Sequence, residues 1–241
     1  MDKLTAIILA AGRGTRMQST DRNKVSLEVK GQPMLLRTID ILKKAGIGSI
    51  VTVVGFAKES VISILPEEVI VAEQTEQLGT GHAVVSALPK VPQDTKDVLI
   101  IYGDDSFLHT PETFQMLYKT HLDQEAKITF ITMESDDPTG FGRILRDENG
   151  QIVGIVEEKN ANEKERQIHE INLGCYIINK QYLEENIKNI HKNPVTGEYY
   201  ITDIIDIISS HNGKIAAYKL TTGKWRGVNT KEDLEAAETF F

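Results

Sequence analysis

Cysteine is almost absent from this sequence, and long apolar segments and an excess of positive charge are absent altogether. Cys175 is the single cysteine among 241 residues, so no intrachain disulfide can form, and we expect a reducing, cytoplasmic environment. No segment reaches the roughly 20 apolar residues that cross a bilayer. The apolar run at residues 6–11 is too short for a secretory signal and leads straight into a basic segment.

The charge balance excludes further classes of protein. Acidic residues number 35 and basic residues 27, which gives a net charge of −8. Proteins that bind nucleic acids or anionic membranes usually carry a basic surface, so we expect neither partner. A small anionic ligand stays compatible with the sequence, since one pocket can be positive on an acidic protein. The six histidines do not fall at the spacing of zinc ligands.

The sequence has the composition of an ordinary globular protein, with 40% hydrophobic and 26% charged residues. In its first half, short runs rich in Ile, Val and Leu alternate with helical patterns, one behind Pro33 and another opening at Thr110. This alternation predicts βαβ units around a parallel sheet. The predicted strands cover residues 5–9, 50–54, 69–72, 98–102 and 128–133.

The pattern changes after about residue 138. Asn149-Gly150 separates two apolar runs and predicts a hairpin, and Thr230 to Asp233 predicts a capping box before the last helix. The fold class is therefore α/β, a Rossmann-like doubly wound mixed sheet with a β-rich excursion, in a single domain. The elements predicted in this part are strands at 142–145, 152–156, 172–178 and 214–220, and helices near 181–190 and 202–209.

The connection after the first predicted strand carries the strongest chemical signal. Gly12 and Gly14 would let backbone N–H groups approach phosphate oxygens. Arg13, Arg16 and Lys24 add positive charge close by, as a triphosphate requires. A glycine-rich turn with solvated basic residues is the simpler alternative. The strand, the loop and the cations together favour phosphate binding.

Two other phosphate-binding motifs do not fit this loop. A Walker P-loop needs Gly-Lys-Ser/Thr at a fixed spacing, and the sequence has none there. The dinucleotide fingerprint needs a third glycine, and Met17 occupies that position.

The segment Gly12-x-Gly14-Thr15-Arg16-Met17, with Lys24, resembles the signature loop of sugar-1-phosphate nucleotidylyltransferases. Within that family, the sequence most resembles the uridylyltransferase domain of bacterial N-acetylglucosamine-1-phosphate uridylyltransferases. The resemblance spans nearly the whole chain. It continues in the family's order through Gln74-x-x-Gln77-Leu78-Gly79-Thr80-Gly81-His82, Tyr102-Gly103-Asp104, Gly140-Phe141-Gly142-Arg143-Ile144, Ile155-Val156-Glu157, Glu170-Ile171-Asn172-x-Gly174, Gly197-Glu198-Tyr199-Tyr200-Ile201-Thr202-Asp203 and Gly227-Val228-Asn229.

The resemblance implies a nucleotide-diphospho-sugar transferase fold. Its nucleotide-binding part would cover about residues 1–137, its sugar-binding part about 138–229, and a C-terminal helix 230–241. The implied reaction transfers the uridylyl group of UTP to N-acetylglucosamine 1-phosphate and gives UDP-N-acetylglucosamine and pyrophosphate. UTP and the sugar 1-phosphate are thus the expected partners, and Mg²⁺ is the expected cofactor.

The same resemblance implies the site residues. Asp104 and Asn229 would be the magnesium ligands, and both offer the oxygen atoms that a hard cation prefers. Arg16 and Lys24 would be the catalytic cations. The implied nucleotide-binding residues are Leu9, Ala10, Ala11, Gly12, Gln74, Gln77, Gly79, Thr80, Tyr102 and Gly103, and the implied sugar-binding residues are Gly142, Glu157, Asn172, Tyr200 and Thr202.

Taken singly, several of these residues have simpler explanations. Asp104 fits a helix cap or a loop carboxylate, Gln74 and Gln77 fit an exposed polar surface, Thr80 fits a helix cap, and Tyr200 fits plain packing. Two chemical arguments support the site. A glutamine amide carries a donor and an acceptor and can read a uracil edge, and a carboxylate directly after a strand is expected at the ligand-binding edge of this sheet.

The sequence departs from the family at three places, one of which is Asp105-Ser106-Phe107 instead of a typical Val-Pro-Leu. Asn23 stands where the family usually has proline, so we expect a more mobile loop around Lys24. Asp105 adds a second carboxylate beside Asp104, and we expect it to face solvent because successive side chains leaving a strand diverge. Phe141 replaces a tyrosine and lacks its hydroxyl. These changes concern rate and sugar preference more than the type of reaction.

Some alternatives stay open. The bifunctional enzymes of the family also carry hexapeptide repeats that transfer acetyl groups, and no such repeat occurs here, so we expect no acetyltransferase domain or activity. A free-standing enzyme and a fragment of a longer protein both fit the sequence, and the oligomeric state is open. One rival function keeps the chemistry with glucose 1-phosphate or another nucleotide. A second rival is a nucleotide-sugar sensor without catalysis.

Overall fold

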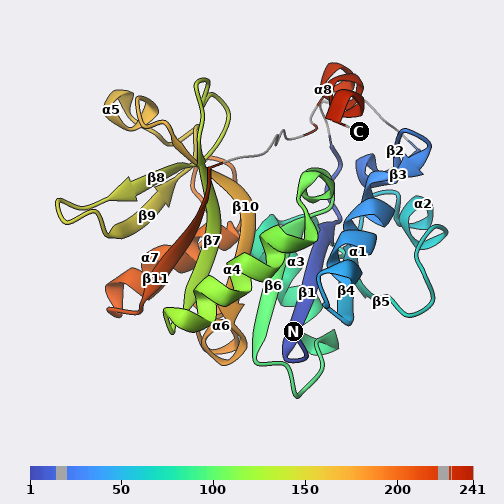
Figure 1. The fold of residues 1–241 in the computed structure, drawn as a ribbon, viewed down its shortest axis with the longest axis horizontal. Helices are drawn as coiled ribbons and strands as arrows, with labels where there is room; N and C mark the ends of the chain where they lie inside the picture. Colours follow the sequence, from blue (N-terminus) through green and yellow to red (C-terminus); the bar gives the residue numbers. More distant parts are fainter. Residues whose placement is uncertain (15–20, 222–227, 229, 241) are drawn as a thin grey trace.

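The computed structural model describes residues 1–14, 21–221, 228 and 230–240 (Figure 1). Within these residues, nine strands form one mixed sheet, whose main path has the order β11-β7-β10-β6-β1-β4-β5. Neighbours along it are parallel, except that β10 runs antiparallel to both β6 and β7. The main-path strands are β1 (Leu4–Ala10), β4 (Ser49–Val54), β5 (Ile70–Glu73), β6 (Asp97–Tyr102), β7 (Ile128–Glu134), β10 (Glu170–Asn179) and β11 (Ile215–Leu220).

Helices cover both faces of the sheet, as the buried side chains of β1 show. Ala6 and Ile8 point to one face and Ile7 and Leu9 to the other, because successive side chains of a strand alternate. The first face is covered by α1 (Met34–Lys44), α2 (Lys58–Ile62) and α4 (Pro111–Asp123), and the second by α3 (Thr80–Ala87), α6 (Lys180–Asn186) and α7 (Ile204–Ser210). The predicted doubly wound mixed sheet is therefore confirmed.

The β-rich excursion is the hairpin of β8 (Arg143–Arg146) and β9 (Ile152–Val156), which lies off the main path of the sheet, at the left of Figure 1. Its turn forms because the Asp147 carboxylate accepts the backbone N–H groups of Asn149 and Gln151, at 2.9 and 2.8 Å. Gly150 supplies the required positive φ of 77°. The short helix α5 (Glu163–Arg166) then leads into β10, which β8 joins at one bridge.

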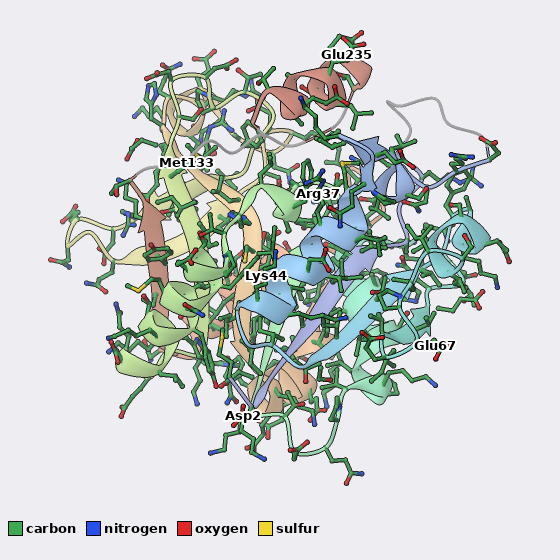
Figure 2. All side chains as sticks on the ribbon, turned by 45° about the vertical axis from the view of Figure 1, so that its right-hand side comes forward. Asp2, Arg37, Lys44, Glu67, Met133 and Glu235 are labelled. Carbon is green, nitrogen blue, oxygen red and sulfur yellow. The ribbon has the colours of Figure 1, made fainter. Side chains whose placement is uncertain are left out.

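The last helix, α8 (Lys231–Ala237), starts with the predicted capping box between Thr230 and Asp233. It packs on a small hairpin, β2 (Glu28–Val29) and β3 (Gln32–Pro33), through a third apolar cluster that includes Val29, Phe107 and Val228. Arg37, labelled in Figure 2, extends from α1 and donates to the carbonyl of Val29 at 2.7 Å. The last helix therefore lies beside the β2–β3 hairpin and Phe107.

Short 3₁₀ turns complete the chain: η2 (Lys24–Ser26), η3 (Leu88–Lys90), η4 (Ser106–Leu108), η5 (Ile187–Asn189), η6 (Ile201–Asp203) and η7 (Glu238–Phe240). The helix predicted near 181–190 is thus divided between α6 and η5, and the one at 202–209 between η6 and α7. No helix in the described part of the chain is both long and apolar enough to span a membrane.

Candidate active site

A cavity of about 480 Å³ opens where β1 and β6 end, at the sheet edge where open α/β folds bind ligands. The sequence-predicted residues that line it are Leu9, Ala10, Ala11, Gly12, Lys24, Gln74, Gln77, Gly79, Thr80, Tyr102 and Asp104. Gly103 is a predicted nucleotide-binding residue that does not line it, and a Cβ at this position would lie 3.0 Å from Val25 Cγ1. Arg13 and Gly14, which the sequence assigned to the phosphate-binding loop, also line the cavity, together with four residues that were not predicted as ligands: Asn23, Val25, Ala83 and Glu198.

Lys24 and Asp104 meet at this cavity. The Lys24 ammonium forms an ion pair with the Asp104 carboxylate and donates to the carbonyl of Val228 at 2.7 Å. The side chains are 12% and 22% exposed, so both stay accessible from the cavity. Arg16 and Asn229, the other implied catalytic and metal residues, lie outside the described residues.

The expectation for Asn23 is corrected by the structure. Asn23 is 1% exposed, and its side chain accepts from the Val25 N–H as the N-cap of η2. Its amide also donates to carbonyls of the neighbouring loop and of Phe56. Instead of loosening the segment before Lys24, Asn23 fastens it, because its amide supplies hydrogen bonds that proline lacks.

Asp105 does not face solvent, which corrects a second expectation. It is buried, and its carboxylate accepts from the Ser106 hydroxyl at 3.1 Å. The chain turns into η4 directly after Asp105, so the extended alternation of strand side chains no longer applies. Burial and the nearby charge of Asp104 raise the pKa of Asp105.

The amide of Gln74 has a defined orientation. Gln74 is 3% exposed, and its Nε2 donates to the carbonyl of Gly79 at 3.0 Å and pairs with Nδ1 of His82 at 3.1 Å. Both amide hydrogens are then used, and Oε1 remains as the acceptor of a side chain that lines the cavity. Gln77 donates to the carbonyl of Gln74 at 3.2 Å and fixes the backbone beside it.

The start of α3 is tied to the segment before η6. The Gly81 N–H donates to the carbonyl of Tyr199 at 2.8 Å, and the Ile201 N–H donates to the Thr80 hydroxyl at 3.0 Å. Gly79 is required here, because a Cβ would lie 2.6 Å from the Tyr199 carbonyl and φ is 104°. Thr80 is the first helical residue and Gly79 the N-cap, so Thr80 does not cap α3.

Four predicted sugar-binding residues form a second group. The Thr202 hydroxyl donates to Glu157 Oε1 at 3.3 Å, and the Asn172 N–H donates to the Gly142 carbonyl at 2.9 Å. A Cβ on Gly142 would lie 3.6 Å from both Asn172 Cβ and Glu157 Oε2. Burial raises the pKa of Glu157, and the Thr202 hydrogen bond opposes that rise. Tyr200, the fifth predicted residue, donates to Thr196 Oγ1 at 2.8 Å.

The cavity with the predicted nucleotide-binding residues and the group around Glu157 adjoin at Tyr102 and Gly174. Gly174 has a φ of 67°, and a Cβ there would overlap the ring of Tyr102, which lines the cavity. The pairing of β10 with β7 is irregular between Asn172 and Tyr176, and this irregularity brings the Asn172 amide to the Tyr176 hydroxyl, at 2.5 Å. The nucleotide-side cavity and the Glu157 group are therefore neighbours across β6 and β10.

Sequence reasoning missed a brace behind the second group. Arg143 is 2% exposed, donates to the carbonyl of Phe141, and pairs with Glu158 at 2.6 Å. Glu158 also accepts from the Gly140 N–H at 3.2 Å, so the turn at Gly142 is held to the strand end that carries Glu157. Their positions in the sequence could have indicated this role, because Arg143 and Glu158 each directly follow a predicted site residue.

Comparison with known proteins agrees with this architecture. The model of the nucleotidyl transferase family matches residues 5–241. The chain belongs to the nucleotidyl transferase family. A crystal structure of a Bacillus anthracis protein, described as a glucose-1-phosphate thymidylyltransferase, superposes with a TM-score of 0.82, covers 98% of this chain and 94% of its own, and shares 23% identity. This structural similarity establishes the shared fold.

Relatives named bifunctional protein GlmU match almost the whole chain. The protein of Heliobacterium modesticaldum is 41% identical over 239 residues, which is 99% of this chain and 52% of the relative. That of Exiguobacterium sibiricum is 43% identical over 235 residues, again 52% of its length. The Bacillus subtilis protein is 41% identical over 243 residues and is also covered to 52%. This nucleotidyl transferase chain thus spans about half the length of these relatives.

Proposed function

We propose that this nucleotidyl transferase moves the uridylyl group of UTP to N-acetylglucosamine 1-phosphate and releases pyrophosphate. The observation that carries the proposal is the junction of the two groups at Tyr102 and Gly174. On one side lies a cavity with Lys24, Asp104 and an oriented Gln74, and on the other lie four groups suited to an acetamido sugar. The sequence similarity to GlmU proteins supports the same assignment.

The reaction is an in-line attack by a phosphate oxygen of the sugar 1-phosphate on the α-phosphorus of UTP. A phosphorus–oxygen bond forms to the sugar phosphate, and the bond to pyrophosphate breaks. The protein mainly has to hold two anions in line and stabilise their charge. In our assignment, Lys24 faces the phosphates, with Arg16 as a second cation in the same sequence motif.

Base and sugar recognition use groups of fixed orientation. Gln74 presents Oε1, which accepts the N3–H of uracil, while cytosine has no proton at N3. On the sugar side, Glu157 accepts sugar hydroxyls, and the backbone of Gly142 and the Asn172 amide lie beside it. Thr202 holds the Glu157 carboxylate in place.

Asp104 fits a magnesium ion that is held mainly by the substrate. Its carboxylate lies at the cavity, where it offers oxygen ligands. Mg²⁺ in nucleotide sites usually takes one or two carboxylates and completes its shell with phosphates and water, so no larger cluster is needed. Within the described residues, no group of three or more His, Cys, Asp or Glu could hold a metal. When bound, Mg²⁺ neutralises negative charge on the phosphates of UTP.

The test is pyrophosphate release with magnesium, in a matrix of substrates. UTP, dTTP, CTP, ATP and GTP are each combined with N-acetylglucosamine 1-phosphate and with glucose 1-phosphate. Turnover confined to UTP with the acetamido sugar is the expected result. Preference for another pair would keep the chemistry and overturn the substrate assignment. Binding of UTP by folded protein without turnover on any pair would contradict the enzymatic proposal.

A further inference from the structure

The buried side chain of Asn23 links the segment before Lys24 to the loop that follows β1. Its Nδ2 lies 2.9 Å from the carbonyl oxygen of Ala10, 3.2 Å from that of Gly12 and 2.9 Å from that of Phe56. Two amide hydrogens serve these three acceptors, so one hydrogen is shared. The side chain therefore acts as a clamp on carbonyl groups from two separate loops.

The other polar groups of Asn23 hold the clamp in place. Oδ1 accepts from the Val25 N–H at 3.2 Å, and the Asn23 N–H donates to the Ser60 hydroxyl at 2.9 Å. The Asn23 carbonyl accepts from the Ser26 hydroxyl at 2.7 Å. The φ of −74° is one that proline also adopts, so the backbone shape does not require asparagine. The amide and the N–H are what this residue contributes.

The clamp fixes the directions in which the backbone C=O and N–H groups of this loop point. The carbonyls of Ala10 and Gly12 are held by Asn23, and the carbonyl of Ala11, between them, accepts from the Phe56 N–H at 3.0 Å. Among the described residues, no acceptor meets the N–H groups of Gly12, Arg13 and Gly14. Gly12, Arg13 and Gly14 line the cavity. Carbonyl oxygens would repel an anion there, whereas free N–H groups attract one.

We propose that Asn23 is a positioning residue for the triphosphate of UTP. It holds three successive carbonyls of the loop, two directly and one through Phe56, away from the phosphates and leaves the loop's N–H groups to bind them. It also starts η2, and so fixes the backbone from which Lys24 reaches the cavity. The inference rests on the proposed function, because it assigns the ligand of this loop as the phosphates of UTP.

Two variants separate the clamp from the backbone shape. Asn23→Ala removes the side-chain amide. Asn23→Pro removes the side-chain amide and the backbone N–H that donates to Ser60, but retains a compatible φ. We expect both to raise the KM for UTP by roughly ten- to hundredfold, because a displaced loop no longer fits the phosphates. The KM for the sugar 1-phosphate should stay within about twofold of wild type, since Asn23 has no contact with the Glu157 group. A merely structural role would lower the melting temperature without this split.

Asn186→Ala is the matched control. Asn186 is a buried asparagine whose Nδ2 donates to the Tyr182 carbonyl at 2.9 Å, and it does not line the cavity. Its replacement should lower the melting temperature and leave both KM values unchanged. A wild-type KM for UTP in folded Asn23→Pro would overturn the proposal.

Binding measurements keep this test separate from the proposed function. Calorimetric titration with UTP and magnesium, without sugar phosphate, reports the loop's affinity even if turnover is absent. We expect weaker UTP binding by about tenfold or more in Asn23→Ala and Asn23→Pro. If wild type binds UTP but turns over no sugar phosphate, the proposed reaction fails while the clamp is still tested. Equal UTP affinity in wild type and both variants would refute the clamp alone.

Discussion

The ammonium group of Lys24 is ion-paired with the carboxylate of Asp104, and the two residues come from different strand–helix connections. Lys24 lies in the connection after β1, and Asp104 is the second residue after β6. The Val228 carbonyl accepts a further hydrogen bond from the same ammonium. The pair therefore joins two edges of the cavity and gives it one fixed cation and one fixed carboxylate.

Removing either member of this pair should slow turnover while the fold is kept. We expect Asp104→Ala and Lys24→Ala each to lower kcat by about a hundredfold or more, because in the proposed reaction each removes a charge that acts at the transferring phosphates. The double variant should lose less than the product of the single effects, since the two groups interact directly. Pyrophosphate release measures the effect. Lys43→Ala breaks the exposed Lys43–Glu68 pair and should retain wild-type turnover.

Gly174→Ala should damage both stability and nucleotide binding. The new Cβ would overlap the Tyr102 ring, and the φ of 67° is strained for any residue with a Cβ. We expect a loss of about 2–4 kcal/mol in the free energy of unfolding, with a higher KM for UTP. Gly48→Ala, where no heavy atom lies within 4 Å, is the control for urea unfolding. Equal stability of the two variants would contradict the close packing at Gly174.

Glu158→Gln should weaken sugar binding through Arg143. The change removes the charge that pairs with the buried Arg143 guanidinium, whose hydrogen bond holds the pKa of Glu158 below its usual value. Because Glu158 is 28% exposed, we expect the free energy of unfolding to fall by about 1–3 kcal/mol, less than for the loss of a fully buried ion pair. The KM for the sugar 1-phosphate should rise and that for UTP stay unchanged. Glu148→Gln, on the exposed β8–β9 turn, is the control, and a rise in both KM values for Glu158→Gln would refute a local brace.

The stability of the fold should depend on pH through Asp203. Burial, together with the charges of Asp206 and Glu157, raises the pKa of Asp203 from 3.8 to about 6, although His191 opposes the shift. A raised carboxyl pKa means that the folded state binds the proton more tightly. The contribution of Asp203 to the stability of the folded state is therefore complete below its pKa in the unfolded chain. This contribution is lost as the pH rises through its pKa in the folded protein.

Asp203→Asn removes this dependence, since its amide does not titrate. We expect the melting temperature of the variant, relative to wild type, to increase between pH 4 and pH 6 and to level off above that window. Differential scanning calorimetry across this range measures it. Asp2→Asn, at an exposed position near the N-terminus (Figure 2), is the control. A constant difference from pH 4 to pH 7 would show that Asp203 has an ordinary pKa.

Much of the fold followed from local patterns. The strand at residues 98–102 and the hairpin at Asn149-Gly150 are confirmed, because their apolar periodicity and turn residues act over short distances. The capping box at Thr230 is confirmed for the same reason. The irregular pairing of β10 was outside the reach of such patterns, since the bulge depends on its contact with β7.

The candidate site shows the same division. The sequence predicted most residues of the site. Of the predicted residues that the structure describes, nearly all lie in the cavity or in the adjoining group around Glu157. The loosening effect of Asn23 and the exposure of Asp105 were predicted wrongly, because the contacts of each residue depend on the folded chain. Asn23 is buried by its contacts with Ala10 and Phe56, and the turn of η4 directs Asp105 inward.

The sequence by itself determined the alternation of strands and helices, the glycine-rich loop with basic residues after the first strand, and the family. These properties depend on periodicity and on residue chemistry at short spacing, which the chain carries before it folds. Only the tertiary structure decided that Lys24 meets Asp104, that Gln74 presents an oxygen, and that Arg143 is buried behind Gly142. Burial and hydrogen-bond partners come from segments brought together by packing, so no local pattern could specify them.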